Sequence, residues 1–263
     1  MQTNVAQDNV PYEKSSSIGW QNHVSSGHTL NTYYNGQVGD WHIDFNADGI
    51  WQDNKIPQEM LEEIIPADGE RKEQTVTSES LDKNTLYAAK LVAEHPLWKG
   101  NFSFGGEYTY TNRLNNYRNV EGILDDDESR IRENSFALFA EYGFRISRLQ
   151  VRAGVRYEHL TSDYFEEDKR IDEQSRTYDN VFPSVSLSLP VGKVQLQLSY
   201  TGSIYRPSYW MLRSNTTYIN RYTYEGGNPF LRPSVINRLS FNASYKCCLL
   251  YTSPSPRDGL LSR

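Results

Sequence analysis

SFALFAEYGFRISRLQVRAGVRYE, residues Ser135–Glu158, alternates apolar and polar side chains with period two across two segments joined by a tight turn. Side chains of a β-strand point alternately to opposite faces of a sheet, so this stretch predicts a hairpin with one apolar and one charged face. Each strand is long enough to cross the apolar layer of a membrane. The apolar face consists of Phe136, Leu138, Ala140, Tyr142, Phe144, Leu149, Val151, Ala153, Val155 and Tyr157.

The same alternation recurs along most of the chain. It covers residues 41–48, 87–94, 102–111, 184–189, 194–201 and 235–246, although a few apolar side chains such as Phe139 and Ile236 lie on the polar face. Consecutive segments of this kind pair as antiparallel neighbours when the links between them are short. The sequence therefore predicts an all-β fold, an antiparallel meander of about nine long strands.

Alternation alone also fits a soluble antiparallel sheet with one face in water. The links between the segments favour a membrane barrel instead, because long structureless loops are uncommon in compact soluble domains. Short turns on one rim and long loops on the other are typical of outer-membrane barrels. Here the short links lie near residues 36–40, 97–100, 146–148 and 190–193, and the long links span residues 52–84, 112–134, 161–180 and 205–234.

The composition agrees with a transmembrane β-barrel. Aromatic residues make up 13% of the chain, including 19 Tyr. The mean hydropathy is only −0.70, and no run approaches the roughly 18 apolar residues of a spanning helix. Aromatic side chains gather at two levels, as in the girdles of a barrel, and ordinary cross-strand packing is the alternative explanation. The two levels are Trp41, Trp98 and Phe144 near the short links, and Trp51, Tyr110, Tyr157 and Tyr200 near the long ones.

Charge and motifs exclude several other functions. The net charge is −6 and no basic stripe is interleaved with aromatic residues, so nucleic acid is not an expected partner. The five histidines are scattered, and Asp125–Glu128 lacks the spacing of a calcium loop, so neither a metal nor a cofactor is expected. No catalytic motif occurs, so the chain is not expected to be an enzyme. Within the first long link, Pro57–Ile65 has apolar residues at a spacing that predicts a short amphipathic helical turn.

The sequence divides into three parts. Residues 1–28 are polar and lack the basic and apolar regions of a signal peptide, so this stretch is expected to be internal to a longer protein. Residues 29–246 form the expected partial barrel. From Cys247 the alternation stops, and Cys248–Asp258 resembles a translated sequencing adaptor, so residues 247–263 are expected to be a non-native tail. A redox or metal pair formed by the two adjacent cysteines is the alternative, although a vicinal disulfide is strained.

Two motifs occur in the last third of the expected barrel. The first is YRPSYWMLR at Tyr205–Arg213, and the second is YTYEGGNPFLRP at Tyr222–Pro233, directly before an alternating strand. Together with that strand they resemble the TonB-dependent outer-membrane receptors, and in particular the outer-membrane protein β-barrel family. The chain departs from the family pattern at Ser234, where an acidic residue is usual.

This resemblance implies that the chain is a fragment of a large transmembrane β-barrel, of about 22 strands, that encloses a plug domain. It implies a location in the cell outer membrane, in contact with lipid, and energy-coupled uptake of a scarce solute such as a siderophore, glycan, peptide or vitamin. The implied partners are that solute, the plug domain and an inner-membrane energy-transducing complex, and this sequence encodes neither of the last two. A small outer-membrane pore or adhesin barrel and a soluble carbohydrate-binding β-sheet protein remain as alternatives.

The candidate ligand-binding residues lie in the long link that follows Tyr205, which is rich in Tyr, Trp and Arg. Aromatic rings with convergent hydrogen-bond donors suit sugars, peptides or chelates, and packing of the rings within the loop is the alternative. A second, polar set, Glu141, Arg152, Arg156 and Glu158, is expected to face the lumen. The candidate ligand-binding residues are Arg206, Tyr209, Trp210, Arg213, Tyr218, Arg221, Tyr222 and Tyr224.

Overall fold

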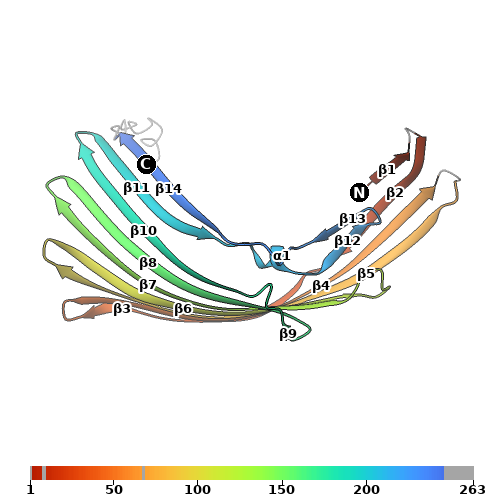
Figure 1. Cartoon of the computed structure of the whole chain (residues 1–263), viewed down its shortest axis with the longest axis horizontal. Coiled ribbons are helices and arrows are strands. Elements are labelled where there is room, and N and C mark those ends of the chain that lie inside the picture. Colours follow the sequence, from red (N-terminus) through yellow and green to blue (C-terminus); the bar gives the residue numbers. More distant parts are fainter. Residues whose placement is uncertain (1, 8–9, 67–68, 246–263) are drawn as a thin grey trace, which may run out of the picture.

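The computed structural model describes residues 2–7, 10–66 and 69–245, and most of these residues belong to one curved antiparallel sheet (Figure 1). A separate two-stranded hairpin and one short helix lie within the curve of this sheet. In chain order the elements are β1 (Gln2–Gln7), β2 (Val10–Gln21), β3 (Val24–Val38), β4 (Trp41–Pro66), β5 (Lys72–Leu97), β6 (Gly100–Asn119), β7 (Asp127–Ile146), β8 (Leu149–Glu166), β9 (Lys169–Arg170), β10 (Arg176–Val191), β11 (Val194–Tyr205), α1 (Tyr209–Leu212), β12 (Thr216–Asn220), β13 (Thr223–Gly226) and β14 (Ser234–Tyr245).

Strands β2 and β3 act as one interrupted strand, because both pair with β4 in a single continuous register. At the interruption, Asn22–His23, the amide of Asn22 donates to the carbonyl of Pro57 at 3.2 Å. Pro57 has no N–H to return a bond, so the ladder breaks there. With β2 and β3 counted together, the described residues form nine long strands in the order β2/β3, β4, β5, β6, β7, β8, β10, β11, β14. The predicted antiparallel meander is confirmed.

All the predicted short links are tight turns at one rim of the sheet, on the left in Figure 1. Each turn has two residues between its strands, and the first residue has a φ between 53° and 63°. This left-handed region is easily reached by glycine and is uncommon for other residues. The first residues of the four turns are Gly39, Trp98, Ser147 and Gly192.

The prediction of long loops is wrong for three of the four long links. Residues 52–84 continue the ladder, since β4 and β5 stay paired from Gln52–Asn84 to Ile64–Lys72. Most of the links at 112–134 and 161–180 likewise belongs to strands β6, β7, β8 and β10. The strands therefore extend well beyond their alternating parts. Alternation disappears in these extensions because polar residues occupy both faces, while the backbone hydrogen bonds continue.

The predicted helical turn at Pro57–Ile65 is also wrong, because these residues form the end of β4. They are paired with β2 on one side and with β5 on the other. Ladders on both edges outweigh a short helical pattern, which would be marginal on its own. In the strand, Met60 and Ile64 share a face with Glu62, while Leu61 lies on the opposite face.

The sheet has two chemically different faces. The outer face carries the alternating apolar residues and leaves them open to the surroundings, with 50% of Leu91, 49% of Leu138 and 48% of Val155 exposed. The inner face carries the polar residues of the same strands. Parts of this face are buried, and Val76 and Ala137 are only 2% and 1% exposed. The predicted division into an apolar and a polar face is confirmed.

Aromatic side chains pack across the strands at the two predicted levels. Near the short turns, the ring of Trp41 lies 5.8 Å from that of Phe104 with the planes perpendicular. Further along, the indole of Trp51 donates to the hydroxyl of Tyr87 at 3.1 Å, and Tyr87 stacks on Tyr110 at 6.1 Å. Aromatic residues at the level of a barrel girdle therefore also pack against each other across the strands, so the two explanations apply to the same residues.

The described sheet does not close into a barrel, because β14 pairs only with β11, and β3 only with β4. An open sheet of nine long strands fits part of a larger barrel. The sheet already begins with β1 at Gln2, so it extends across the expected boundary at residue 29. The expected tail, residues 247–263, lies outside the described residues.

Candidate functional site

A chain of charged side chains crosses the inner face near the middle of the sheet. The guanidinium of Arg156 on β8 lies 3.3 Å from the carboxylate of Glu107 on β6 and 3.4 Å from that of Glu158. Arg152 and Glu141 pair at 3.3 Å nearer the short turns. The structure thus places all four residues that were expected to face the lumen on the inner face.

The fourth long link, between β11 and β14, folds back over the inner face within the curve of the sheet (Figure 1). We call residues 206–233 the inner loop. It contains α1 and the β12–β13 hairpin, and it reaches from the end of β11 to the far ends of β2 and β4. This link is the only long one that is not mostly strand in the described part of the chain.

The first anchor of the inner loop is at α1. Arg206 forms an ion pair with the buried carboxylate of Glu158, and the hydroxyl of Tyr209 donates to the carboxylate of Glu133. The guanidinium of Arg113 lies over the ring of Tyr209, 3.6 Å from its centre. Burial and the neighbouring Glu133 carboxylate raise the pKa of Tyr209, so this side chain stays a neutral hydrogen-bond donor.

The second anchor lies between α1 and the hairpin. The hydroxyl of Ser214 donates to the carboxylate of Asp127 at the start of β7, with distances of 2.8 and 2.9 Å to the two oxygens. Arg213 donates to the hydroxyl of Thr217 at 3.3 Å and packs against the ring of Trp210, 4.9 Å from its centre. These contacts fix the direction in which the chain leaves α1.

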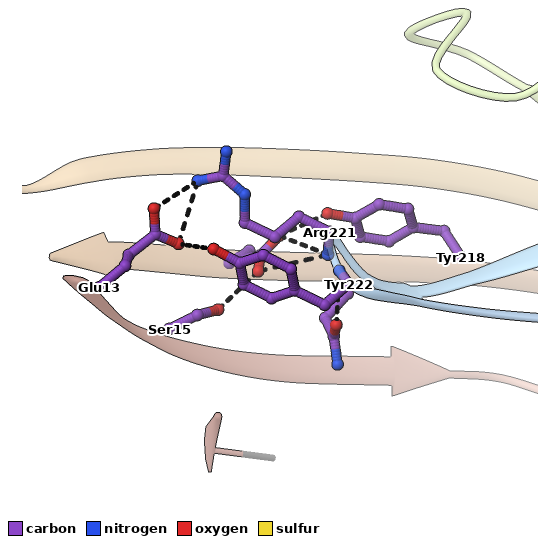
Figure 2. Close-up of polar contacts among 7 residues, drawn as sticks. Glu13, Ser15, Tyr218, Arg221 and Tyr222 are labelled. Atoms are coloured by element: carbon purple, nitrogen blue, oxygen red, sulfur yellow. Dashed lines mark hydrogen bonds and ion pairs between the residues drawn. The ribbon is translucent and has the colours of Figure 1, made fainter. Parts of the chain in front are cut away.

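The third anchor joins the tip of the β12–β13 hairpin to two carboxylates on β2 and β4 (Figure 2). Tyr218 donates its hydroxyl proton to Glu62, which also accepts from Ser15 at 2.6 Å and from the backbone amide of Arg221 at 3.2 Å. Glu13 accepts from the guanidinium of Arg221 at 3.2 Å and from the hydroxyl of Tyr222 at 2.5 Å. Glu62 is completely buried, so this anchor satisfies a carboxylate that water does not reach.

The Asn228–Pro233 end of the second sequence motif closes the inner loop. The amide of Asn228 donates to the carbonyl of Met211 at the end of α1, at 2.6 Å. The side chain of Asn228 accepts from the amide of Phe230 at 2.9 Å, which forms a local turn. A side chain at Gly227 would collide with the carbonyl of Arg213, so this close approach requires glycine.

The eight candidate ligand-binding residues thus divide into two groups. Most of them hold the inner loop against the sheet, which is the alternative that the sequence left open. Trp210 and Tyr224 keep about half of their surface exposed, at 51% and 49%, and Arg213 lines a cavity. The residues that hold the loop are Arg206, Tyr209, Tyr218, Arg221 and Tyr222.

Sequence reasoning missed the carboxylates on the sheet that receive the loop. All four of them lie in stretches that were assigned to long links or to the polar N-terminal part, where acidic residues are expected to be solvated. Their partners lie far away in the sequence: Glu62 and Tyr218 are 156 positions apart, and Glu13 and Tyr222 are 209 positions apart. No local pattern could have indicated these pairs. The missed carboxylates are Glu13, Glu62, Asp127 and Glu133.

Two cavities lie between the inner loop and the sheet, one on each side of Tyr209. The first, of about 220 Å³, is lined by β4, β5, β6 and β7 and by Trp210 and Arg213 of the loop. The second, of about 180 Å³, lies next to Glu133 and the proline-rich end of the loop. Within the described ranges, no group of three or more His, Cys, Asp or Glu side chains is arranged to hold a metal ion. No helix of the described residues is long and apolar enough to cross a bilayer.

Comparison with known protein families identifies the family of this chain. Residues 39–257 match the model of the outer membrane protein beta-barrel family. The chain belongs to this family. It is therefore part of an outer-membrane protein, and the expectation that it is not an enzyme is confirmed because the family is one of membrane barrels. The match overlaps the first part of the 247–263 segment, whose non-native origin stays a prediction.

Three solved structures are among those that are similar to this chain. The ferric citrate transporter FecA is 12% identical, with a TM-score of 0.41, over 73% of this chain and 36% of its own. The hemophore receptor HasR of Serratia marcescens is 13% identical, with a TM-score of 0.49, over 92% and 43%. BauA, the ferric preacinetobactin receptor of Acinetobacter baumannii, is 9% identical, with a TM-score of 0.38, over 91% and 50%. The chain thus spans half or less of each of these structures, and a search of curated proteins found no match.

Proposed function

We propose that the chain forms part of the wall of a TonB-dependent receptor, which takes up a scarce solute across the outer membrane with energy from the inner membrane. The observation that carries this proposal is the inner loop, which three sets of polar contacts fasten to the inner face. A general diffusion pore keeps its lumen open to water, whereas here folded chain covers the polar wall. Family membership and the motifs at Tyr205–Arg213 and Tyr222–Pro233 support the same proposal.

The proposal includes the partners that the sequence resemblance implies. A plug domain would satisfy the charged side chains of the lower inner face, such as Arg152 and Glu141, which are still 59% and 39% exposed. An inner-membrane complex would supply the energy. The solute would meet the inner loop from the outside of the cell, where the exposed rings of Trp210 and Tyr224 are available.

The test is to delete the gene in its native host and to compare uptake of scarce solutes, each as the limiting nutrient. The receptor proposal expects loss of uptake of one solute class, and expects a protonophore to abolish the same uptake in the parent strain. A passive pore would instead give uptake that a protonophore leaves unchanged. An adhesin would give normal uptake and reduced attachment to surfaces. Either of these two results would overturn the proposal.

A further inference from the structure

The four short turns at one rim of the sheet share a charged position (Figure 1). Each turn has two residues, and the second of them is basic in three of the four turns. The exception is Asp40, in the turn between β3 and β4. The three basic side chains are exposed, and within the described ranges none of them takes part in an ion pair. They are Lys99, Arg148 and Lys193, which we call the rim cations.

Each rim cation follows an exposed apolar side chain by one or two residues. The exposed fractions of these apolar side chains are 90% for Trp98, 60% for Ile146 and 51% for Val191. Ile146 and Val191 lie on the outer face, where the apolar side chains of a membrane barrel contact lipid. The rim therefore combines apolar side chains at the edge of the apolar layer with cations directly beyond it. A surface that lies in the headgroup region of a bilayer has this arrangement.

Trp98 shows most clearly that this rim meets something outside the protein. Its φ is 53°, and the equivalent position is glycine in two of the other three turns, Gly39 and Gly192. A bulky residue in this left-handed region is strained, and strained residues concentrate at functional surfaces. The indole packs edge-on against Tyr142, with 6.4 Å between the ring centres, and is nevertheless almost fully exposed. Tryptophan is enriched at the headgroup level of membranes, which would bury this ring.

The height of the rim matches the headgroup layer. Trp41 and Trp51 mark the two aromatic levels and are ten residues apart on β4. Ten residues extend roughly 33 Å along a tilted strand, which fits an apolar band about 25 Å tall. Arg148 follows Phe144 across the turn, so it lies roughly 7–10 Å further along the strands than the lower aromatic level. The headgroup layer is about 5–8 Å deep on each side, so the rim cations lie at the depth of the lipid phosphates.

The excess of positive charge is confined to this rim. The chain as a whole has a net charge of −6. At the opposite rim, the connection between β6 and β7, residues 120–126, has three acidic residues and no basic one. Near the short turns, Glu94 and Glu141 lie on the inner face, where they line a hollow together with Lys99. Glu141 is paired with Arg152 at 3.3 Å, and neither Arg148 nor Lys193 lines this hollow.

We propose that the rim cations bind the phosphate groups of anionic phospholipids in the periplasmic leaflet of the outer membrane. The short turns of outer-membrane barrels face the periplasm, so this leaflet is the one they meet. Each Lys or Arg near an anionic lipid surface strengthens association about fivefold. A zwitterionic headgroup carries its own cation beside the phosphate, so an anionic headgroup is preferred. The rim lies at the lipid side of the wall, so this preference is independent of the solute that the receptor takes up.

The test measures which lipid lies next to Trp98 when the full chain is inserted in vesicles. The vesicles contain equal amounts of phosphatidylcholine and phosphatidylglycerol, and one of the two carries bromine atoms, which quench tryptophan fluorescence on contact. Subtracting the signal of the matching Trp98→Phe protein isolates Trp98. We expect brominated phosphatidylglycerol to quench Trp98 at least about twofold more strongly than brominated phosphatidylcholine. We expect 1 M salt, where charge interactions reach only about 3 Å, to remove this difference.

Two triple variants locate the preference. The first, Lys99→Gln, Arg148→Gln and Lys193→Gln, removes the rim cations and should make quenching by the two lipids equal. The second, Lys72→Gln, Arg118→Gln and Lys169→Gln, removes the same number of Lys and Arg charges from exposed positions at the opposite end of the sheet. This control should keep the preference, because Arg118 lies eight residues, roughly 26 Å, beyond the upper aromatic ring of Tyr110. Far-UV circular dichroism and heat-dependent gel mobility check that both variants fold.

Each other outcome would overturn the proposal. Equal quenching of the wild type by both lipids would mean that the rim does not select an anionic headgroup. A preference that persists without the rim cations would place the anionic lipid at other residues. Equal loss of the preference in both triple variants would trace it to the total charge of the chain. Absence of quenching by either lipid would place Trp98 outside the membrane, and would favour a soluble periplasmic partner for this rim.

Discussion

The two halves of the sheet differ in which side chains they expose and which they bury. We call the part between the short turns and the level of Trp51 and Tyr157 the lower region, and the strand extensions beyond this level the upper region. In the lower region, large apolar side chains such as Leu91 are half exposed on the outer face. In the upper region, the fully buried side chains include a carboxylate, that of Glu62. One continuous ladder thus carries an apolar exterior at one end and a buried polar interior at the other.

This difference shows which interactions each half of the sheet depends on. Lipid satisfies the lower region, and any apolar residue of suitable size will serve there. The upper region depends on particular partners, because a buried carboxylate is stable only when it is hydrogen bonded or paired. Apart from Ser15, the partners of Glu62 and Glu13 come from a loop that lies more than 150 residues further along the chain.

The largest expected effect comes from removing the carboxylate at the centre of the upper region. Glu62→Ala leaves the buried hydroxyls of Tyr218 and Ser15 without their acceptor, at a cost of about 1–3 kcal/mol each. We expect the β12–β13 hairpin to detach, with rapid tryptic cleavage at Arg221. Glu59→Ala changes an exposed carboxylate three residues away and serves as the control. Equal protection of both variants would mean that Glu62 does not hold the hairpin.

The next effect tests whether lipid really defines the lower region. Leu91→Arg places a charge on the outer face of β5, halfway between the two aromatic levels, and should destabilise the inserted sheet by about 2–4 kcal/mol. Leu81→Arg makes the same change on the same face of β5, ten residues higher, roughly 30 Å along the strand. We expect a cost near zero there, measured by urea unfolding in lipid vesicles. Equal costs at both positions would contradict a membrane boundary near Trp51.

The same comparison explains what the sequence could predict. The β7 and β8 strands were predictable because every second residue contacts lipid, so the alternation has strong contrast. The extension of β4 through Pro57–Ile65 was not, because polar and apolar residues occur on both faces and the pairing with β2 and β5 alone decides the structure. Local spacing then favoured a helix that the ladder overrides.

The sequence indicated which loop to consider as a candidate site, and it did not indicate the contacts that its side chains make. Its richness in aromatic and arginine residues drew attention to the 206–233 loop, which the structure places over the inner face of the sheet. Each side chain, however, has two possible roles, and only the position of a partner decides between them. Tyr222 holds the loop because Glu13 lies beside it, whereas Trp210 stays half exposed next to a cavity.

A smaller expected effect is a pH dependence of stability in the upper region. Burial, together with the hydrogen bond to Glu62, raises the pKa of Tyr218 above its ordinary value of 10.0. Because the folded pKa lies above the unfolded one, the stabilisation by this hydroxyl is complete below pH 10 and declines as the pH rises beyond it. Tyr218→Phe should cost about 1 kcal/mol at neutral pH, and the difference from wild type should shrink above pH 10.

Tyrosinate absorbance checks this pH dependence, since the difference spectrum between wild type and Tyr218→Phe reports on one hydroxyl. We expect this hydroxyl to ionise only above pH 10. Ionisation at or below this pH would show that the hydroxyl is open to water and that the hairpin is not docked.

The smallest effect concerns the point where the β2/β3 strand is interrupted. Asn22 donates to the carbonyl of Pro57, and antiparallel residues at such a position normally exchange two bonds. Pro57→Ala supplies the missing N–H, worth about 0.5–1.5 kcal/mol, and at the same time gives the unfolded chain more freedom, at about 0.4–1 kcal/mol. The net change in stability should therefore be close to zero, while the new amide of residue 57 should be protected from hydrogen exchange.

Pro66→Ala is the matched control for this last change. Position 66 lies nine residues further along β4, and hydrogen-bonded and non-hydrogen-bonded positions alternate, so its amide points away from β2. The pairing of β4 with β5 has already ended at Ile64. The new amide at position 66 should thus exchange quickly. If both new amides exchange at the same rate, the interruption at Asn22–His23 is a true boundary between two strands, and the proline is not its cause.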